Sequence, residues 1–136
     1  MGKRTKELPG PALLVHPNMA FLTALQQALT SKGIACVVAR DLATALLAIT
    51  QHEFVIAIIN SRIAEEGDGW ALGGVLRKLS PVAYIAMTCG EKDVLAIQAT
   101  INNRLNEIFD AKAGSEEVAS AIMAKLQPGA EKSVVH

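Results

Sequence analysis

The stretch FVIAIIN, residues 54–60, consists of six apolar residues followed by one polar residue. A continuous apolar run, without alternating polar side chains, is typical of a strand buried on both faces of a parallel sheet. No apolar run in the sequence is longer, and a membrane-spanning helix needs roughly 20 such residues. The stretch therefore predicts an internal strand of a sheet covered by helices, and argues against a membrane protein.

Strands and helices are predicted to alternate on both sides of this run. Further apolar runs predict strands at residues 12–15, 34–39, 82–87 and 107–111. Apolar residues at helical spacing lie between and after them: Phe21, Leu22, Leu25 and Leu29; Leu42, Leu46 and Ile49; Leu72, Val75, Leu76 and Leu79; Val94, Ile97 and Ile101; and Val118, Ile122 and Leu126. Five such units predict an α/β fold with three layers and a parallel five-stranded sheet.

Length and composition limit the function classes. The chain has 136 residues, of which 51% are hydrophobic and 19% charged, which fits a single globular domain. Thirteen basic residues balance thirteen acidic ones, so no net charge attracts the chain to nucleic acid or to an anionic membrane. Its two cysteines, Cys36 and Cys89, are too few for a disulfide framework or a zinc cluster. We expect a cytoplasmic protein that binds neither nucleic acid nor membrane.

The domain boundaries follow from the two ends. Residues 1–11 contain basic residues without the apolar segment of a secretory signal, so they predict a flexible N-terminal lead. Residues 12–127 form the predicted domain. Pro128 and Gly129 begin residues 128–136, a C-terminal tail or the start of a linker.

Polar or special residues follow four of the predicted strands. His16 and Pro17 follow the first, Asn60 the third, Thr88 the fourth and Lys112 the fifth. In open parallel sheets, ligands bind in the crevice beyond the carboxyl ends of the strands. We therefore expect these five residues to lie together in one pocket.

The order of these residues resembles the receiver domain of bacterial response regulators, over nearly the whole chain from about Ala12 to Leu126. The matching segments are residues 13–21, residues 54–60, Asp68-Gly69, Thr88 and Lys112. The resemblance implies a (βα)5 fold with strand order 2-1-3-4-5. It also implies that Phe109, three residues before Lys112, is the aromatic residue that switches conformation; Ala111 is the rival to Lys112 in the alignment.

The chain departs from the family at the residues that carry its chemistry. His16 and Pro17 occupy the places of the acidic pair that holds magnesium, and Asn60 occupies the place of the phosphate-accepting aspartate. An amide has no anionic oxygen for nucleophilic attack on a phosphoryl group. Magnesium prefers carboxylate oxygens. We therefore expect a pseudo-receiver that is not an enzyme, is not phosphorylated on aspartate and binds neither magnesium nor another cofactor or metal.

Several residues have two interpretations from sequence alone. His16 is either a weak candidate for ligand contact or a solvated loop residue. Asn60 either locks one conformation by bonding Thr88 or Lys112, or merely satisfies nearby backbone groups. Lys112 itself is expected to point into water. The acidic run Glu65, Glu66 and Asp68 is expected to be solvated surface, and Trp70 to be partly buried rather than a partner anchor.

The resemblance also implies a partner surface on the fourth helix, fifth strand and fifth helix. Its candidate residues are Phe109, Glu91, Lys92, Leu95, Gln98 and Glu116. The expected partners are other signalling proteins or an effector domain, with a homodimer as a further option. Two alternatives stay open: a receiver that is phosphorylated unusually or binds a small effector in the crevice, and a small flavodoxin-like cofactor-binding domain. No phosphate-binding glycine motif supports the latter.

Overall fold

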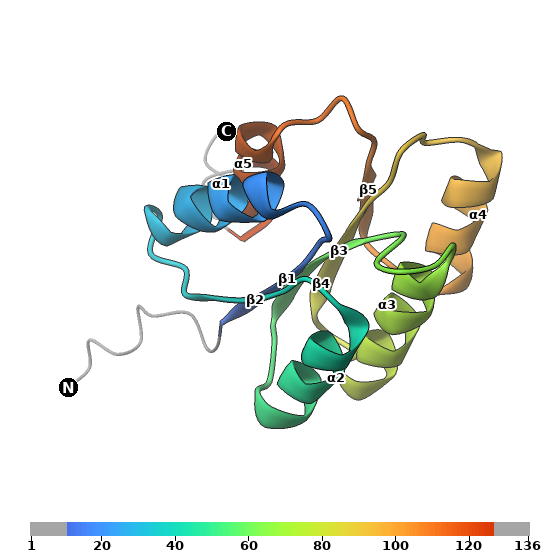
Figure 1. Cartoon of the computed structure of the whole chain (residues 1–136), viewed down its shortest axis with the longest axis horizontal. Coiled ribbons are helices and arrows are strands. Elements are labelled where there is room, and N and C mark those ends of the chain that lie inside the picture. Colours follow the sequence, from blue (N-terminus) through green and yellow to red (C-terminus); the bar gives the residue numbers. More distant parts are fainter. Residues whose placement is uncertain (1–10, 127–136) are drawn as a thin grey trace, which may run out of the picture.

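The computed structural model describes residues 11–126, which form a five-stranded parallel sheet between two layers of helices (Figure 1). The strand order is β2-β1-β3-β4-β5, which confirms the predicted fold class and topology. The elements are β1 (Ala12–Val15), α1 (Met19–Thr30), β2 (Cys36–Ala39), α2 (Leu42–Gln51), β3 (Ile56–Asn60), α3 (Asp68–Leu79), β4 (Tyr84–Thr88), α4 (Val94–Asn102), β5 (Glu107–Phe109) and α5 (Ser115–Leu126). The predicted lead, apart from residue 11, and the predicted tail lie outside the described residues.

The strand register aligns the carboxyl ends of the central strands. Asn60, the last residue of β3, pairs with Thr88, the last residue of β4, and Thr88 pairs with Phe109 at the end of β5. On the other side, Ile59 of β3 pairs with Val15 at the end of β1. Residues that end different strands are therefore neighbours at one edge of the sheet.

Two apolar clusters cover the two faces of the sheet. Alternate residues of β1 point to opposite faces, so that Leu13 and Val15 belong to one cluster and Ala12 and Leu14 to the other. Figure 1 shows α1 and α5 on one side of the sheet, and α2, α3 and α4 on the other. Both faces are therefore buried, as the uninterrupted apolar strands predict.

Side-chain caps begin three of the helices. Asn18 accepts a hydrogen bond from the backbone N–H of Phe21, and Asp41 accepts one from that of Thr44. Asp93 caps α4 in the same way. These contacts satisfy backbone donors that have no partner within the helix.

In three helices, apolar residues that were predicted to face the core are exposed instead. Val94, Ile97 and Ile101 of α4 are exposed, whereas the smaller Ala96 and Thr100 face the sheet. Leu46 of α2, and Val75 and Leu79 of α3, are likewise exposed. Small inward residues let a helix pack close to the sheet, so the largest apolar residues do not identify the buried face.

Four strands also differ from their predicted limits, and one of them, β5, ends at Phe109, two residues before the predicted end at Ala111. β2, β3 and β4 each begin two residues later than predicted, and Val82 is 92% exposed in the turn after Pro81. The β3–β4 ladder begins only where the N–H of Tyr84 reaches the carbonyl of Val55. No helix between residues 11 and 126 is long and apolar enough to cross a membrane.

Candidate functional site

A cavity of about 350 Å³ lies at the carboxyl edge of the sheet. It brings together three of the five predicted pocket residues, His16, Asn60 and Thr88. The others that line it are Asn18, Phe21, Cys89, Gly90, Asp110, Ala111 and Ala113. Pro17 and Lys112 do not line it, so the prediction of one pocket holding all five residues is wrong for these two.

Asn60 is held in one orientation by two hydrogen bonds. The hydroxyl of Thr88 donates to Asn60 Oδ1 at 2.8 Å, and Asn60 Nδ2 donates to the carbonyl of Arg62 at 2.6 Å. Because a carbonyl can only accept, the second contact fixes which end of the amide faces Thr88. The backbone N–H of Ser61 also donates to the carbonyl of Thr88 at 2.7 Å. Asn60 therefore both bonds Thr88 and satisfies a nearby backbone group.

His16 lies at the same edge as a neutral, partly buried side chain. Its Nδ1 accepts a hydrogen bond from the N–H of Asn18 at 3.0 Å, and its ring centroid lies 4.6 Å from that of Phe21. Burial lowers the pKa of His16, which favours the neutral imidazole. With Nδ1 accepting, the proton of the neutral ring resides on Nε2.

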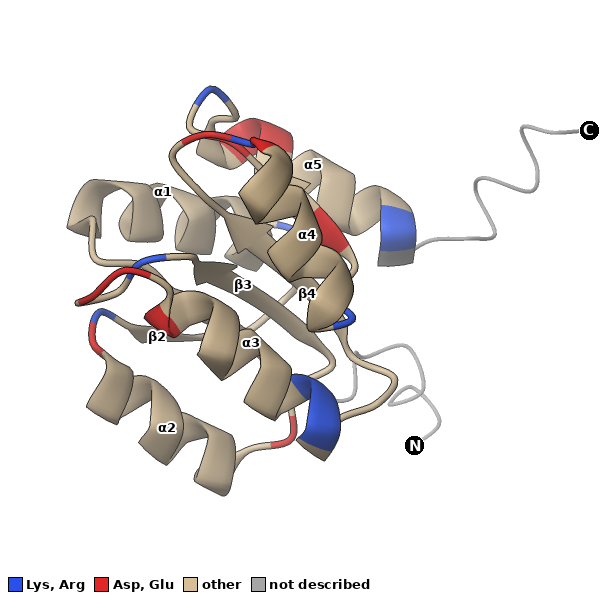
Figure 2. Cartoon of the chain, turned by 90° about the vertical axis from the view of Figure 1, so that its right-hand side faces the viewer, with Lys and Arg blue, Asp and Glu red and all other residues tan. Residues whose placement is uncertain are grey.

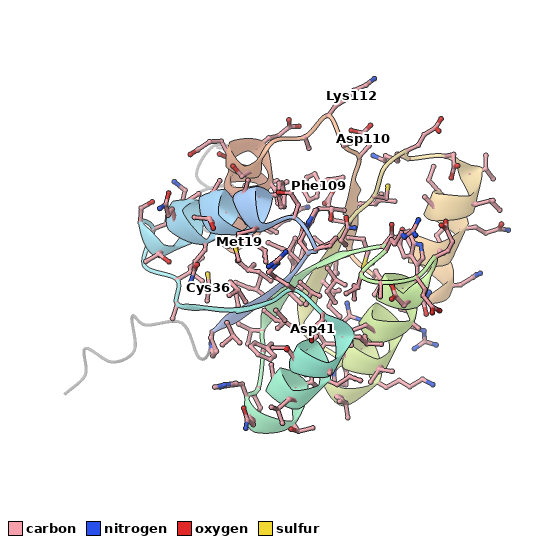
Figure 3. All side chains as sticks on the ribbon, in the orientation of Figure 1. Met19, Cys36, Asp41, Phe109, Asp110 and Lys112 are labelled. Atoms are coloured by element: carbon pink, nitrogen blue, oxygen red, sulfur yellow. The ribbon has the colours of Figure 1, made fainter. Side chains whose placement is uncertain are left out.

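Lys112 lies outside the cavity because β5 ends at Phe109 and the chain then turns. The carboxylate of Asp110 accepts from the N–H of Lys112, and the carbonyl of Asp110 accepts from the N–H of Ala113. Figure 3 shows the Lys112 side chain directed away from the body of the protein. Ala111 lines the cavity instead, so the structure favours the rival alignment at this strand.

Phe109 faces the layer formed by α1 and α5. It packs against the cluster that contains Leu22 and Val118, whereas its neighbour Ile108 packs beneath α4 against Cys89 and Ala96. Adjacent residues of a strand point to opposite faces. Phe109 therefore lies on the α5 side of β5, and the predicted partner surface of α4, β5 and α5 includes both of these elements.

The β3–α3 loop is built around Asp68 and Gly69. The Asp68 carboxylate accepts hydrogen bonds from the backbone N–H groups of Ile63, Ala64 and Glu65 at 2.7 to 2.9 Å. A Cβ on Gly69 would lie 1.8 Å from the carbonyl oxygen of Asn60. The Asp-Gly pair thus closes the loop beside Asn60, and Asp68 is a structural acid rather than solvated surface.

Asp110 is a cavity residue that the sequence analysis missed. It is the one carboxylate among the residues lining the cavity, and it is partly buried directly after β5. The sequence analysis placed it inside the predicted strand of residues 107–111, whereas β5 ends at Phe109. Within residues 11–126, no three His, Cys, Asp or Glu side chains form a group suited to a metal ion.

The comparisons with known proteins bear on the fold. No protein-family model matches the chain. The photosynthetic apparatus regulatory protein RegA of Rhodobacter capsulatus is 25% identical over 113 residues, which are 83% of this chain and 61% of that relative. The chain therefore spans less than two thirds of the length of that regulator.

Several solved structures of response regulators have a similar fold. A CheY-like response regulator receiver domain protein from Methanospirillum hungatei JF-1 superposes with a TM-score of 0.78 at 19% identity, covering 90% of this chain and 97% of the other. This chain has the receiver fold. A Burkholderia pseudomallei response regulator, which holds a phosphorylated aspartic acid, calcium and citrate, superposes with a TM-score of 0.72 at 20% identity, covering 85% and 71% of the two chains.

Proposed function

We propose that this receiver-fold chain is a regulatory module of signal transduction that works without phosphorylation of an aspartate. The observation that carries the proposal is Asn60 at the end of β3, with both ends of its amide in hydrogen bonds to Thr88 and Arg62. The resemblance assigns this position to the phosphate acceptor. In place of a reactive carboxylate, the chain has a neutral group engaged in internal contacts.

The chemistry of the neighbouring residues supports the same proposal. Formation of an acyl phosphate needs a carboxylate oxygen as nucleophile, and the Asn60 amide supplies none. Magnesium is held best by several oxygen ligands, whereas β1 is followed by the imidazole of His16 and by Pro17. Asp110 is one carboxylate in the cavity, and its Oδ1 accepts the N–H of Lys112. We therefore propose that the module acts by binding rather than by catalysis, without magnesium.

The partners we propose are other signalling proteins or an effector domain in the cytoplasm. The candidate residues of the partner surface other than Phe109 are all exposed: Glu91, Lys92, Leu95, Gln98 and Glu116. Protein interfaces generally combine an apolar centre with a polar rim, and these exposed residues include both apolar and charged side chains. A second copy of the chain is an alternative partner for the same surface.

Intact-protein mass spectrometry after incubation with acetyl phosphate and magnesium tests the proposal. We expect no added phosphoryl group on the wild-type chain and none on Asn60→Ala. A phosphoryl adduct that hydroxylamine removes from the wild type, and that is absent from Asn60→Ala, would overturn it. An adduct on both proteins would place an acyl phosphate on another carboxylate, Asp110 first, and would equally contradict the proposal.

The cavity itself favours one second candidate, the binding of a small effector. His16, Asn60 and Asp110 present an imidazole, an amide and a carboxylate to a space of about 350 Å³. An NMR titration with magnesium and beryllofluoride tests one class of effector, a phosphoryl-like anion. Unchanged amide signals at His16, Asn60 and Thr88 support the first proposal, and saturable shifts there support a phosphoryl-like ligand.

A further inference from the structure

A second hollow of about 540 Å³ lies between the start of α3 and the length of α4. Trp70 of α3 and Leu95, Ala96 and Ala99 of α4 supply its apolar lining. We call this hollow the α3–α4 groove. It shares only Cys89 and Gly90 with the cavity that contains Asn60.

The apolar side of the groove continues onto the outer surface of α4. Trp70 packs against the small cluster formed by Cys89, Ala96 and Ile108, so its ring is held in place from below. Leu95 is 74% exposed at the groove. No residue of α4 is charged, and Figure 2 shows its ribbon without any acidic or basic residue. An exposed apolar surface does not stabilise the isolated chain. Its burial by a partner removes apolar area from water and therefore stabilises the complex.

The polar side of the groove is acidic. Glu66, Glu91 and Asp93 line it together with a single cation, Arg62. Arg62 Nη1 lies 3.9 Å from Glu66 Oε1 in a pair that is largely exposed and therefore weak. The three acidic residues and the one cation give the groove a formal net charge of −2. Asp93 caps α4 through one oxygen.

The nearby lysines do not neutralise this rim. Lys92 and Lys112 line another hollow, which also contains Asp110 and Glu117 on the β5 side of the β4–α4 loop. Figure 2 shows acidic residues in the loops that lead into α3 and α4, and it shows no charged residue in α4 itself. The groove therefore combines an aromatic and aliphatic floor with a negative edge.

We infer that the α3–α4 groove binds a basic, apolar segment of a partner protein. Its Arg or Lys side chains would lie at Glu66 and Glu91, and its apolar side chains against Trp70 and Leu95. A guanidinium beside an indole and a carboxylate is stabilised by both. The acidic edge repels anionic lipid and acidic segments, so charge selects the class of partner. This site does not depend on whether Asn60 accepts a phosphoryl group.

The chain contains one tryptophan, so its fluorescence reports on the groove directly. The probe is a short amphipathic peptide of Leu, Ala and Arg without aromatic residues, titrated into the full chain. The matched peptide carries Glu at every Arg position. We expect a saturable change in Trp70 fluorescence with the Arg peptide, weakened by added salt, and no saturable change with the Glu peptide.

Charge reversal at the rim locates the contact. The double variant Glu66→Lys with Glu91→Lys is expected to bind the Arg peptide at least about tenfold more weakly, whereas Glu53→Lys, an exposed reversal in the loop before β3, should bind it as the wild type does. Asp93 is left unchanged because it caps α4. Equal urea midpoints for all the proteins show that the fold is kept.

Three results would overturn the inference: no saturable signal, equal binding of both peptides, or equal loss of affinity in the Glu53→Lys control. None of these depends on the mass spectrometry described above. A phosphoryl adduct at Asn60 would end the proposal of phosphorylation-independent signalling and leave the groove intact. The failure of one idea is therefore distinguishable from the failure of the other.

Discussion

Gly69 is the residue at which the fold leaves no space for a side chain. A Cβ there would meet the Asn60 carbonyl oxygen at 1.8 Å, and the nearest atoms all belong to the backbone of Asn60 and Ser61, which cannot move aside as a flexible side chain could. We predict that Gly69→Ala lowers the free energy of unfolding by about 3 kcal/mol, the upper end of ordinary overpacking costs. Urea unfolding followed by circular dichroism measures it.

Gly90→Ala is the matched control for this change. A Cβ on Gly90 would have no atom within 4 Å, and the residue has no positive φ. Its free energy of unfolding should stay within about 0.5 kcal/mol of the wild type. Equal effects of the two substitutions would show that the close approach of Gly69 to β3 is absent in solution.

The Thr88 hydroxyl holds the amide of Asn60 in place. Thr88→Val keeps the β-branched shape of this buried side chain but removes the donor to Asn60 Oδ1. We predict a loss of about 1 to 2 kcal/mol, because a partly buried acceptor is left without its partner. Thr50→Val, which removes an exposed hydroxyl that bonds the Leu47 carbonyl, should cost less than about 0.5 kcal/mol in the same urea assay.

The sequence predicted Asn60 and Thr88 at the site because each ends an unmistakable apolar run. It did not predict which residue after β5 enters the cavity. Ala111 and Lys112 lie in the turn after β5, so the geometry of that turn decides which of them reaches the cavity. β5 is only three residues long and gives little pattern from which to choose.

Arg77 joins three elements at the opposite end of the sheet. Its guanidinium donates to the carbonyls of Arg104, Ser80, Pro81 and Ala83, and to Asn106 Oδ1. It therefore ties the end of α3 to the start of β4 and to the loop before β5. The sequence analysis found no role for Arg77, since these partners are backbone carbonyls that no pattern of residue types marks.

We predict that Arg77→Met destabilises the fold by about 2 to 3 kcal/mol, because several carbonyls lose a charged donor. Arg77→Lys should restore less than half of this, since one ammonium cannot reproduce the planar fork of a guanidinium. Lys78→Met removes the neighbouring exposed cation and should leave the urea midpoint nearly unchanged. A loss at Lys78→Met equal to that at Arg77→Met would point to surface charge instead.

Helix orientation was the feature that apolar spacing predicted least well. In α4 the predicted stripe of Val94, Ile97 and Ile101 faces outward, while Ala96 and Thr100 contact the layer below. A helix with large apolar residues on one side and small ones on the other has two candidate inner faces. Only the space available between α4 and the sheet decides between them, and that distance depends on tertiary packing.

At the scale of the whole molecule, the three-layer architecture followed from the residues themselves. Five apolar runs separated by amphipathic segments leave few alternatives to a parallel sheet covered on both faces. The strand order did not follow from the residues, because the same alternation fits more than one doubly wound arrangement. It came from the receiver resemblance, and the structure confirms it.

Stability of the whole fold should fall in two steps as the pH is lowered. Burial lowers the pKa of His16. Burial alone would raise the pKa of Asp68, but hydrogen bonds from the backbone N–H groups of Ile63, Glu65, Ala64 and Gly69 outweigh it and leave this pKa below its ordinary value. In both cases the unfolded chain binds protons more readily than the folded chain. Acid therefore favours unfolding in two separate pH windows.

The stabilising contribution of His16 is fully present above its ordinary pKa of about 6.5 and is lost as the pH falls below it. That of Asp68 is present above about pH 4 and is lost below it. We predict that His16→Asn, which keeps an acceptor for the Asn18 N–H, flattens the fall in urea midpoint between pH 7 and 5, and that Asp68→Asn flattens only the fall below about pH 4. If both variants followed the wild-type curve throughout, acid sensitivity would arise outside the strand-end site and its supporting loop.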